Sequence, residues 1–277
     1  MDVRMAVLTG ALFAAGPIGA QPTGVSDFIG TARDFDFVVL GEIHDNPEHH
    51  RIQAEIVDAL QPAALVFEMI PQDREDEVNR LRSEGAGRDD IAAALDWEAS
   101  GWPDFAMYAP ILEAAPDALV FGAALPVEDV RRAVSEGAAE VFGVDAEIFG
   151  LDVALDPDEQ AAREATQAAA HCDALPADML PGMVEAQRLR DAALANSARW
   201  ARTISGGQVV VITGTGHADR LRGMPAKLLV ADPEARVLSL GQFEAVPDAP
   251  EAFDAYMMAV APERDDPCAV FSDRPAE

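Results

Sequence analysis

The chain has 277 residues, enough for one large α/β domain or two smaller domains with a sizeable buried core. It carries 20 basic residues against 49 acidic ones, a net charge of −29, and Lys227 is its only lysine. Because a surface with this charge repels nucleic acid and anionic membranes, we exclude both as partners.

The first 20 residues have the pattern of an export signal. Arg4 provides the positive start, the apolar stretch MAVLTGALFAA follows, and the small residues GPIGA precede Gln21. This stretch is shorter than the roughly 20 residues that a membrane-spanning helix requires. We therefore expect residues 1–20 to be the signal peptide of an exported, periplasmic protein. The alternative is an ordinary buried N-terminal helix.

Five apolar runs of strand length follow along the chain. They are nearly continuous rather than alternating, as in strands that helices cover on both faces. Helical patterns lie between them, for example in residues 47–60 and 74–84. The alternation of strand and helix predicts an α/β fold with a largely parallel central sheet and helices on both faces. The predicted strands are residues 36–41, 63–68, 118–125, 208–214 and 235–241.

The middle and the end of the chain depart from this alternation. Residues 156–203 are helical throughout in pattern, which predicts a helical insertion that forms a lid or a subdomain. Residues 246–277 are acidic and contain prolines, and we expect them to be a tail. The predicted α/β domain therefore spans residues 25–245.

A Gly-x-x-His motif closes two of the predicted strands, the first at His44 and the fourth at His217. Glu42 lies within the first motif, and Glu68 closes the second predicted strand. The carboxyl ends of parallel strands meet at one edge of the sheet, where ligands bind. We therefore expect these four side chains to line one crevice.

A helix start follows the first motif. Asn46 is a favourable N-cap and Pro47 suits the first helical position, so His49 and His50 lie in the first turn. The positive end of the helix lowers the pKa of a histidine, which favours a neutral imidazole that ligates or hydrogen-bonds. The alternative is that both histidines are solvated.

The predicted insertion contains the fifth histidine and a polar stripe. His171 ends one predicted helix, and the next helix carries Gln187, Arg190 and Asp191 along one face. Polar residues are unusual on a buried face, so one interpretation is a stripe that faces the crevice. The alternative is a solvated face with local ion pairs.

Two other groups of residues leave alternatives open. Trp97, Trp102 and Tyr108 lie close together and form either part of the core or the wall of a flat apolar ligand site. Cys172 and Cys268 are too few for a disulfide framework, and the sequence does not decide whether they pair. The chain has no CxxC or CxxCH, which excludes a thioredoxin-type site and covalent attachment of c-type haem.

Three separated motifs resemble the ChaN family of bacterial haem-binding proteins: LGEIHDNPEHHRIQ, HCDALP…MVEAQRLRDA and GTGHADRLRGMP. The resemblance extends from about Phe35 to Pro225. It places the chain in a superfamily with the Tiki and TraB proteins and, more distantly, the erythromycin esterases. It implies an α/β sheet with a helical insertion, haem as the ligand and a role in iron uptake, in some members as a homodimer with haem between the subunits.

The resemblance also implies roles for particular residues. Tyr108 becomes the candidate axial ligand, because tyrosinate suits ferric haem. His44, His171 and His217 are alternative ligands or groups that hydrogen-bond the ligand. Gln187, on the polar stripe, joins them as a cofactor-binding residue.

The chain departs from the family pattern in two places. No cysteine follows the apolar N-terminal stretch, so we expect no stable membrane anchor. Asp219 stands where an arginine commonly follows GxGHA in the family. The change weakens any contact with a haem propionate, although Arg220 and Arg222 lie nearby.

The Tiki relatives imply an alternative function. They are regarded as metal-dependent peptidases, and Glu42, His44, Glu68 and His217 resemble their site in residue type. These side chains would bind Zn²⁺, Mn²⁺ or Co²⁺ and activate water, with Glu42 and Glu68 as the catalytic carboxylates. Haem binding is the first hypothesis, because the motif HCxxLP…AQxxRDA matches the ChaN family more closely. A third hypothesis is a silent relative whose site only stabilises the fold.

Overall fold

The computed structural model describes residues 21–266 and 268–269. The predicted signal peptide, residues 1–20, lies outside the described residues, as does the end of the predicted tail from residue 270. Among the described residues, no helix is both long and apolar enough to cross a membrane.

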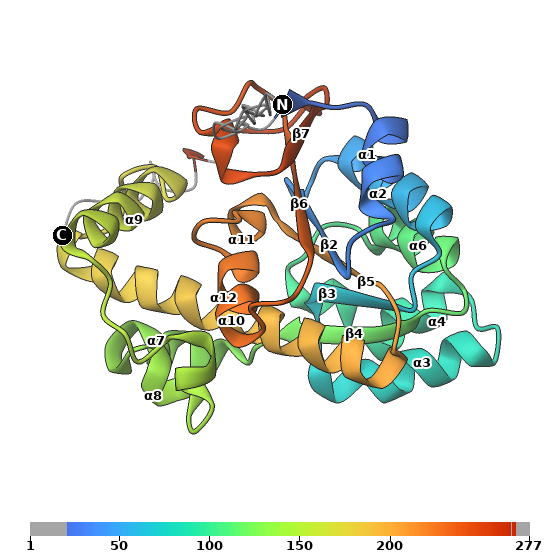
Figure 1. Cartoon of the computed structure of the whole chain (residues 1–277), viewed down its shortest axis with the longest axis horizontal. Helices are drawn as coiled ribbons and strands as arrows, with labels where there is room; N and C mark the ends of the chain where they lie inside the picture. Colours follow the sequence, from blue (N-terminus) through green and yellow to red (C-terminus); the bar gives the residue numbers. More distant parts are fainter. Residues whose placement is uncertain (1–20, 267, 270–277) are drawn as a thin grey trace, which may run out of the picture.

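Seven parallel strands form one sheet within the described part of the chain, in the order β1-β7-β6-β2-β5-β3-β4 (Figure 1). All five predicted strands are present, so the predicted parallel sheet is confirmed. β1 and β7 were not predicted, because two and four residues are too few to form a recognisable apolar run. The strands are β1 (Gln21–Pro22), β2 (Phe37–Glu42), β3 (Ala64–Pro71), β4 (Leu119–Ala124), β5 (Val209–Gly214), β6 (Val237–Phe243) and β7 (Ala255–Met258).

Helices flank this sheet along the whole described chain. Those before β4 are α1 (Val25–Ala32), α2 (Pro47–Leu60), α3 (Glu75–Ser83), α4 (Arg88–Ala94), α5 (Trp97–Ser100) and α6 (Phe105–Ala114). Those after it are α7 (Val127–Glu136), α8 (Ala138–Phe142), α9 (Pro157–Ala170), α10 (Leu180–Ser205), α11 (Thr215–Ala218) and α12 (Met224–Ala231). Short 3₁₀ turns lie at Gln72–Arg74, Ala146–Phe149, Ala177–Met179 and Pro250–Ala252.

Two hydrophobic cores lie on opposite faces of the sheet. Val38 and Leu40 of β2 pack into one core with residues of α1, α2, α3, α4 and α6. Phe37 and Val39 of the same strand pack into the other core with residues of α7, α8, α10, α11 and α12. Successive side chains of a strand point to opposite faces, and here both faces are covered, so every residue of β2 is buried. The predicted helices on both faces are therefore confirmed.

The predicted helical insertion contains α9 and most of α10. α9 has no buried residue, whereas α10 packs against β3, β4 and β5 and contributes Leu189, Ala195 and Ala198 to the core. In Figure 1, α9 and the start of α10 lie at one side of the sheet, and the end of α10 runs beneath it. α10 is thus both part of the insertion and a core helix, which fixes the position of α9 relative to the sheet edge.

The segment after residue 245 extends the sheet and then crosses its edge. β7 pairs with β6, although it lies within the predicted tail. Beyond β7, the carbonyl of Val260 accepts a hydrogen bond of 3.1 Å from Asn46 Nδ2. Arg264 Nε lies 3.0 Å from Asp45 Oδ2, and its guanidinium also pairs with Glu244. This part of the chain therefore packs on the turn that follows His44.

A disulfide joins Cys172 to Cys268, with a Cα–Cα distance of 5.7 Å. It answers the question that the sequence left open. Cys172 lies two residues beyond the end of α9, so the bond ties the C-terminal segment to the insertion.

Candidate functional site

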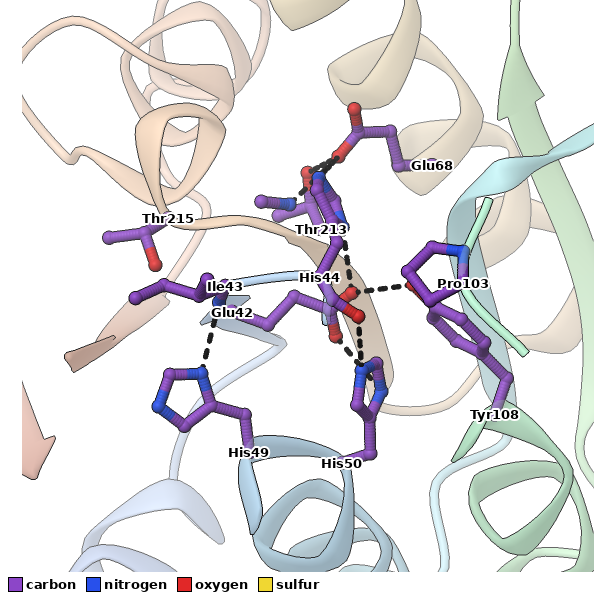
Figure 2. A network of polar contacts seen from close by, with 12 residues as sticks. Glu42, Ile43, His44, His49, His50, Glu68, Pro103, Tyr108, Thr213 and Thr215 are labelled. Carbon is purple, nitrogen blue, oxygen red and sulfur yellow. Dashed lines mark hydrogen bonds and ion pairs between the residues drawn. The ribbon is translucent and has the colours of Figure 1, made fainter. Parts of the chain in front are cut away.

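Glu42 is the last residue of β2, and its carboxylate organises the first motif. Its side chain is fully buried. Oε1 lies 2.8 Å from His44 Nδ1 and accepts a 3.1 Å hydrogen bond from the Tyr108 hydroxyl. Oε2 lies 3.4 Å from His50 Nδ1. Figure 2 shows Glu42 between these three side chains, which come from the turn after β2, from α2 and from α6. The carboxylate therefore links three elements below the sheet edge.

The start of α2 buries two histidines. Asn46 caps the helix, since its side chain accepts from the backbone N–H groups of Glu48 and His49. His49 Nδ1 accepts a 3.0 Å hydrogen bond from the Ile43 N–H, and His50 Nε2 lies 2.8 Å from the His44 carbonyl oxygen. Both histidines are at most 2% exposed, so the alternative of solvated first-turn residues is wrong. Burial holds the pKa of His49 below its usual value, as a neutral acceptor requires.

Glu68 of β3 contacts the second motif as Glu42 contacts the first. Its Oε2 accepts hydrogen bonds of 2.8 Å from the Thr213 hydroxyl and from the Gly214 N–H. A Cβ at Gly214 would lie 2.9 Å from His44 Nε2, so only glycine lets β5 approach His44 this closely. Gly214 thus brings the two Gly-x-x-His motifs together at one edge.

His217 lies between two buried carboxylates. Its Nδ1 is 2.6 Å from Asp191 Oδ1 on α10, and its Nε2 is 3.4 Å from Glu68 Oε1. Gln187 Nε2 lies 2.9 Å from the same Nδ1. Asp191 is 1% exposed and faces the sheet edge, whereas Arg190 on the same stripe is exposed, so the stripe is only partly buried.

The charges of this group stabilise one another. Burial alone would lower the pKa of His217, but the carboxylates of Glu68 and Asp191 raise it to about 10. Burial would raise the pKa of Glu68, but the charge and hydrogen bond of His217 hold it well below its usual range. His217 is therefore an imidazolium at neutral pH, and Glu68 is a carboxylate.

His44 is the most exposed side chain of the two motifs. Its side chain is 31% exposed, and its ring packs edge-on against Trp102 at a centroid distance of 4.9 Å. Burial lowers its pKa, but the hydrogen bond that it donates to Glu42 and the charges of Glu68 and Glu42 raise it above the usual value. His44 Nε2 lies 4.0 Å from Glu68 Oε2, so the structure brings Glu42, His44, Glu68 and His217 to one edge, as predicted.

Tyr108 lies on the protein side of this group. It is 1% exposed, and its ring packs against those of His50 and Trp97 at 4.4 and 5.1 Å. Burial and the charge of Glu42 raise the pKa of its hydroxyl, which is therefore protonated and donates to Glu42. Trp97 is buried as well, whereas Trp102 is only half-buried, so the aromatic group is mainly core.

A pocket of about 410 Å³ opens beside the second motif, between α9, α10 and the turn after α11. His171, Gln187 and Asp191 line it, together with apolar side chains such as Val130, Met183 and Val184. The pocket therefore brings together the parts of the insertion that the sequence singled out, next to His217.

His171 lines this pocket at the C-terminal end of α9. Its Nδ1 lies 2.8 Å from the carbonyl oxygen of Gln167, so Nδ1 carries the proton that this carbonyl accepts. In a neutral imidazole, the lone pair of Nε2 is then available to a ligand.

Sequence reasoning did not single out Thr213 or Arg163. Thr213 directly precedes the glycine of the second motif. Its place at the end of a predicted strand is the signal that could have assigned it to the same sheet edge as Glu68. Arg163 lies on α9 at no motif, and no pattern in the sequence connects it with the pocket. Among the residues that the structure describes, no group of three or more His, Cys, Asp or Glu side chains is arranged to hold a metal ion.

Comparisons with known proteins find the same fold in solved structures. Among solved structures, ChaN of Campylobacter jejuni, described as binding haem cofacially, has a TM-score of 0.64 at 16% identity, over 83% of this chain and 89% of its own. The type III effector HopBA1 has a TM-score of 0.50 at 15% identity, over 90% of this chain and 99% of its own. At these identities the likeness concerns the fold alone. No curated protein matches the sequence.

A profile of the family described as haem-binding uptake, Tiki superfamily, ChaN matches residues 28–228. The matched segment contains β2 to β5 and the greater part of α12, and with them both Gly-x-x-His motifs, the insertion and the pocket. It also spans well over half of the chain, so this protein belongs to the ChaN family of haem-binding uptake proteins.

Proposed function

We propose that this protein binds haem in the cell envelope and takes part in haem or iron uptake. Membership of the ChaN family supports haem as the ligand, and ChaN of Campylobacter jejuni is a haem-binding protein of the same fold. The signal-like residues 1–20 support export to the periplasm. The disulfide is in keeping with an oxidising compartment.

The observation that carries the proposal is the placement of His171 in the pocket. Haem supplies a flat apolar macrocycle and an iron that takes an axial ligand. Val130, Met183 and Val184 provide apolar walls, and the volume of about 410 Å³ lies in the usual range for small-molecule and cofactor sites. The Gln167 carbonyl fixes the His171 proton on Nδ1, as in most metal-ligating histidines. The residues present therefore fit haem.

His171 replaces Tyr108 as our candidate for the axial ligand. Tyr108 is 1% exposed and donates to Glu42, so a tyrosinate here would lose a hydrogen bond and face a buried carboxylate. His44 is the second candidate, because it is partly exposed beside Trp102. His217 is held between two carboxylates, and we propose that it positions Gln187 and Asp191 at the wall of the pocket.

A haemin titration of the purified protein, followed by visible absorption, tests the proposal. We expect a saturable Soret band with one haem per chain or, if a homodimer holds haem between its subunits, a larger complex in light scattering. His171→Ala should change the position of the Soret band and weaken binding, whereas His44→Ala should leave the spectrum unchanged. Absence of a saturable change in the wild type would sink the proposal, and the opposite behaviour of the two variants would make His44 the ligand.

The second candidate function is a metal-dependent hydrolase. Glu68 lies between the two imidazoles, 3.4 Å from His217 Nε2 and 4.0 Å from His44 Nε2, and this observation favours it. Glu42 would orient His44, and Zn²⁺, Mn²⁺ or Co²⁺ would activate water. Metal analysis of the purified protein tests it. Stoichiometric metal that Glu68→Gln abolishes would support this function, and metal-free protein after dialysis against each ion would refute it.

A further inference from the structure

We propose that the pocket selects an amphipathic ligand with two carboxylate groups, and that Arg163, Arg190 and Arg222 bind these groups. The inference rests on the proposed function, since haem carries two propionates, and it adds the residues and the chemical class that the site would accept. It also predicts that the iron is not needed for recognition.

The arginines stand out against the composition of the chain. The protein has only 20 basic residues and a net charge of −29, yet three arginines line this one pocket. They come from α9, from α10 and from the turn after α11. Elements that are separate in sequence thus converge on one small volume with the same charge.

Glu159 holds two of the guanidinium groups side by side. Its Oε1 lies 2.7 Å from Arg163 Nε and 3.2 Å from Arg222 Nε. Arg163 Nη1 also lies 3.3 Å from the Arg222 carbonyl oxygen. Within the described part of the chain, Arg163 Nη2 and both Nη atoms of Arg222 have no hydrogen-bond partner, so one carboxylate can still reach them. A planar guanidinium suits such a two-pronged contact.

Arg190 is the third cation, one turn along α10 from Gln187. It is exposed, and no ion pair or hydrogen bond joins its side chain to any described residue. Elsewhere on the surface, Arg51, Arg80 and Arg132 each pair with two carboxylates of their own helix. Arg190 is therefore free to bind the second carboxylate of a ligand.

The two aspartates in the lining have hydrogen-bond partners of their own. Asp191 is paired with the imidazolium of His217 at 2.6 Å. Asp219 accepts hydrogen bonds of 2.7 and 3.1 Å from the N–H groups of Leu221 and Arg222, and burial raises the pKa of its carboxyl group. Glu159 and Asp219 offset part of the charge of Arg163 and Arg222, whereas Arg190 keeps its full charge beside the apolar walls, an arrangement that suits an amphipathic ligand with carboxylate groups.

Three porphyrins distinguish the contribution of the carboxylates to binding from that of the iron. They are haemin, metal-free protoporphyrin IX and protoporphyrin IX dimethyl ester. We expect protoporphyrin IX to bind within about tenfold of haemin, and the neutral ester to bind at least about tenfold more weakly, because it loses both carboxylate charges. Quenching of tryptophan fluorescence measures all three affinities on the same protein.

Arginine variants assign the contacts. Arg190→Gln and Arg222→Gln should each weaken protoporphyrin IX about tenfold and leave the ester unchanged, so that each variant reduces the preference for the free acid. The matched control is Arg80→Gln on α3, an exposed arginine outside the pocket, which should change neither affinity. Circular dichroism checks that every variant is folded.

The outcomes distinguish this inference from the proposed function. Equal binding of acid and ester, with no effect of the arginine variants, overturns the inference even if haemin binds. Arginine-dependent binding of protoporphyrin IX without binding of haemin supports it and contradicts the haem proposal. Arginine-dependent binding of a long-chain monocarboxylate such as palmitate, with the affinity of protoporphyrin IX, overturns the requirement for two carboxylates.

Discussion

Glu42 shows how the site depends on single side chains. A buried carboxylate without partners would cost several kcal/mol, yet this one ends a central strand with its side chain fully buried. Tyr108 donates to it, and imidazoles of His44 and His50 lie within 3.4 Å. The strand end, α2 and α6 are therefore coupled through one charge, and a change at any of the three partners affects the orientation of His44.

Tyr108→Phe should leave the haem spectrum unchanged and lower the free energy of unfolding by about 1 kcal/mol, the usual value of one hydrogen bond. The loss is modest because His44 still binds the same oxygen of Glu42. Urea unfolding and a haemin titration of the same variant measure both effects. A shifted Soret band would restore Tyr108 as the axial ligand.

The pair of His217 and Glu68 predicts a pH dependence of stability. The pKa of His217 is about 10 in the folded protein against 6.5 in the unfolded chain, so its contribution is complete below pH 6.5 and is lost as the pH rises toward 10. Lys227, whose pKa is lowered to about 8, acts in the opposite sense above pH 8. Between pH 6.5 and 8, the wild type should therefore lose about 1 kcal/mol per pH unit through His217.

Urea unfolding of the wild type and of His217→Gln over this pH range isolates the contribution. The variant retains His44 and Lys227, so the difference between the two curves reports His217 together with its effect on the pKa of Glu68 and Asp191. It should also be several kcal/mol less stable at pH 6.5, because it leaves Asp191 buried without its counter-charge and Glu68 with His44 alone. Parallel curves for the two proteins would contradict the imidazolium assigned to His217.

The sequence predicted which residues form the site better than it predicted how deeply they are buried. Glu42, His44, Glu68 and His217 follow from the rule that parallel strands end at one edge, and the structure brings them together there. The burial of His49 and His50 could not be predicted, because it depends on how α2 packs under the Ile43 turn. The role of Tyr108 depends in the same way on the packing of α6 against α2, which brings its hydroxyl to Glu42.

At the scale of elements, the contact of β3 with β4 depends on one glycine. The pairing register shifts between Phe67 and Pro71, and a Cβ at Gly122 would lie 2.1 Å from the Ile70 carbonyl oxygen. Gly122→Ala should therefore lower the free energy of unfolding by about 3 kcal/mol, through overpacking of the strand pair. Chemical denaturation measures the loss.

Gly30→Ala is the matched control. Gly30 is exposed on α1, and a Cβ there would meet nothing within 4 Å. Since alanine is the better helix former, this variant should gain up to about 1 kcal/mol. If both variants lose stability equally, backbone conformation rather than contact with Ile70 explains the effect.

The disulfide should stabilise the whole chain, because it closes a loop of 96 residues in sequence separation. The double variant Cys172→Ser, Cys268→Ser should lose about 4 kcal/mol, as expected for a loop near 100 residues. A reductant should lower the urea midpoint of the wild type to that of the variant and leave the variant unchanged. A midpoint that no reductant shifts would mean that the bond contributes little to stability.

Elements were predictable where burial makes a strand continuously apolar over six residues or more, which holds for β2 to β6, including β4 at one edge of the sheet. β1 and β7 escaped prediction because two and four residues are too few to form an apolar run, and their pairing depends on contacts made elsewhere in the fold. The C-terminal segment escaped for a related reason. Its position depends on hydrogen bonds and ion pairs of Asn46 and Arg264 and on the disulfide, which join residues about 100 or more apart in sequence. Composition alone describes this segment only as an acidic tail.

For the molecule as a whole, the net charge and the arginines of the pocket act on an anionic ligand at different distances. The net charge of −29 repels any anionic ligand at long range, whereas the arginines of the pocket attract it only on contact. Salt screens the first effect strongly, because the Debye length falls from about 30 Å at 0.01 M to about 8 Å at 0.15 M. The two effects should therefore appear in different rate constants.

Stopped-flow binding of protoporphyrin IX at increasing salt separates them. The association rate constant should rise about threefold between 0.01 and 0.15 M salt as the repulsion is screened, and the dissociation rate constant should rise as the arginine pairs weaken. The uncharged dimethyl ester should show neither change. An association rate constant that falls with salt would mean that the arginines steer the ligand from a distance despite the net charge. In that case Arg190→Gln should slow association. If salt instead acts by screening the net charge, Arg190→Gln should change the dissociation rate constant alone.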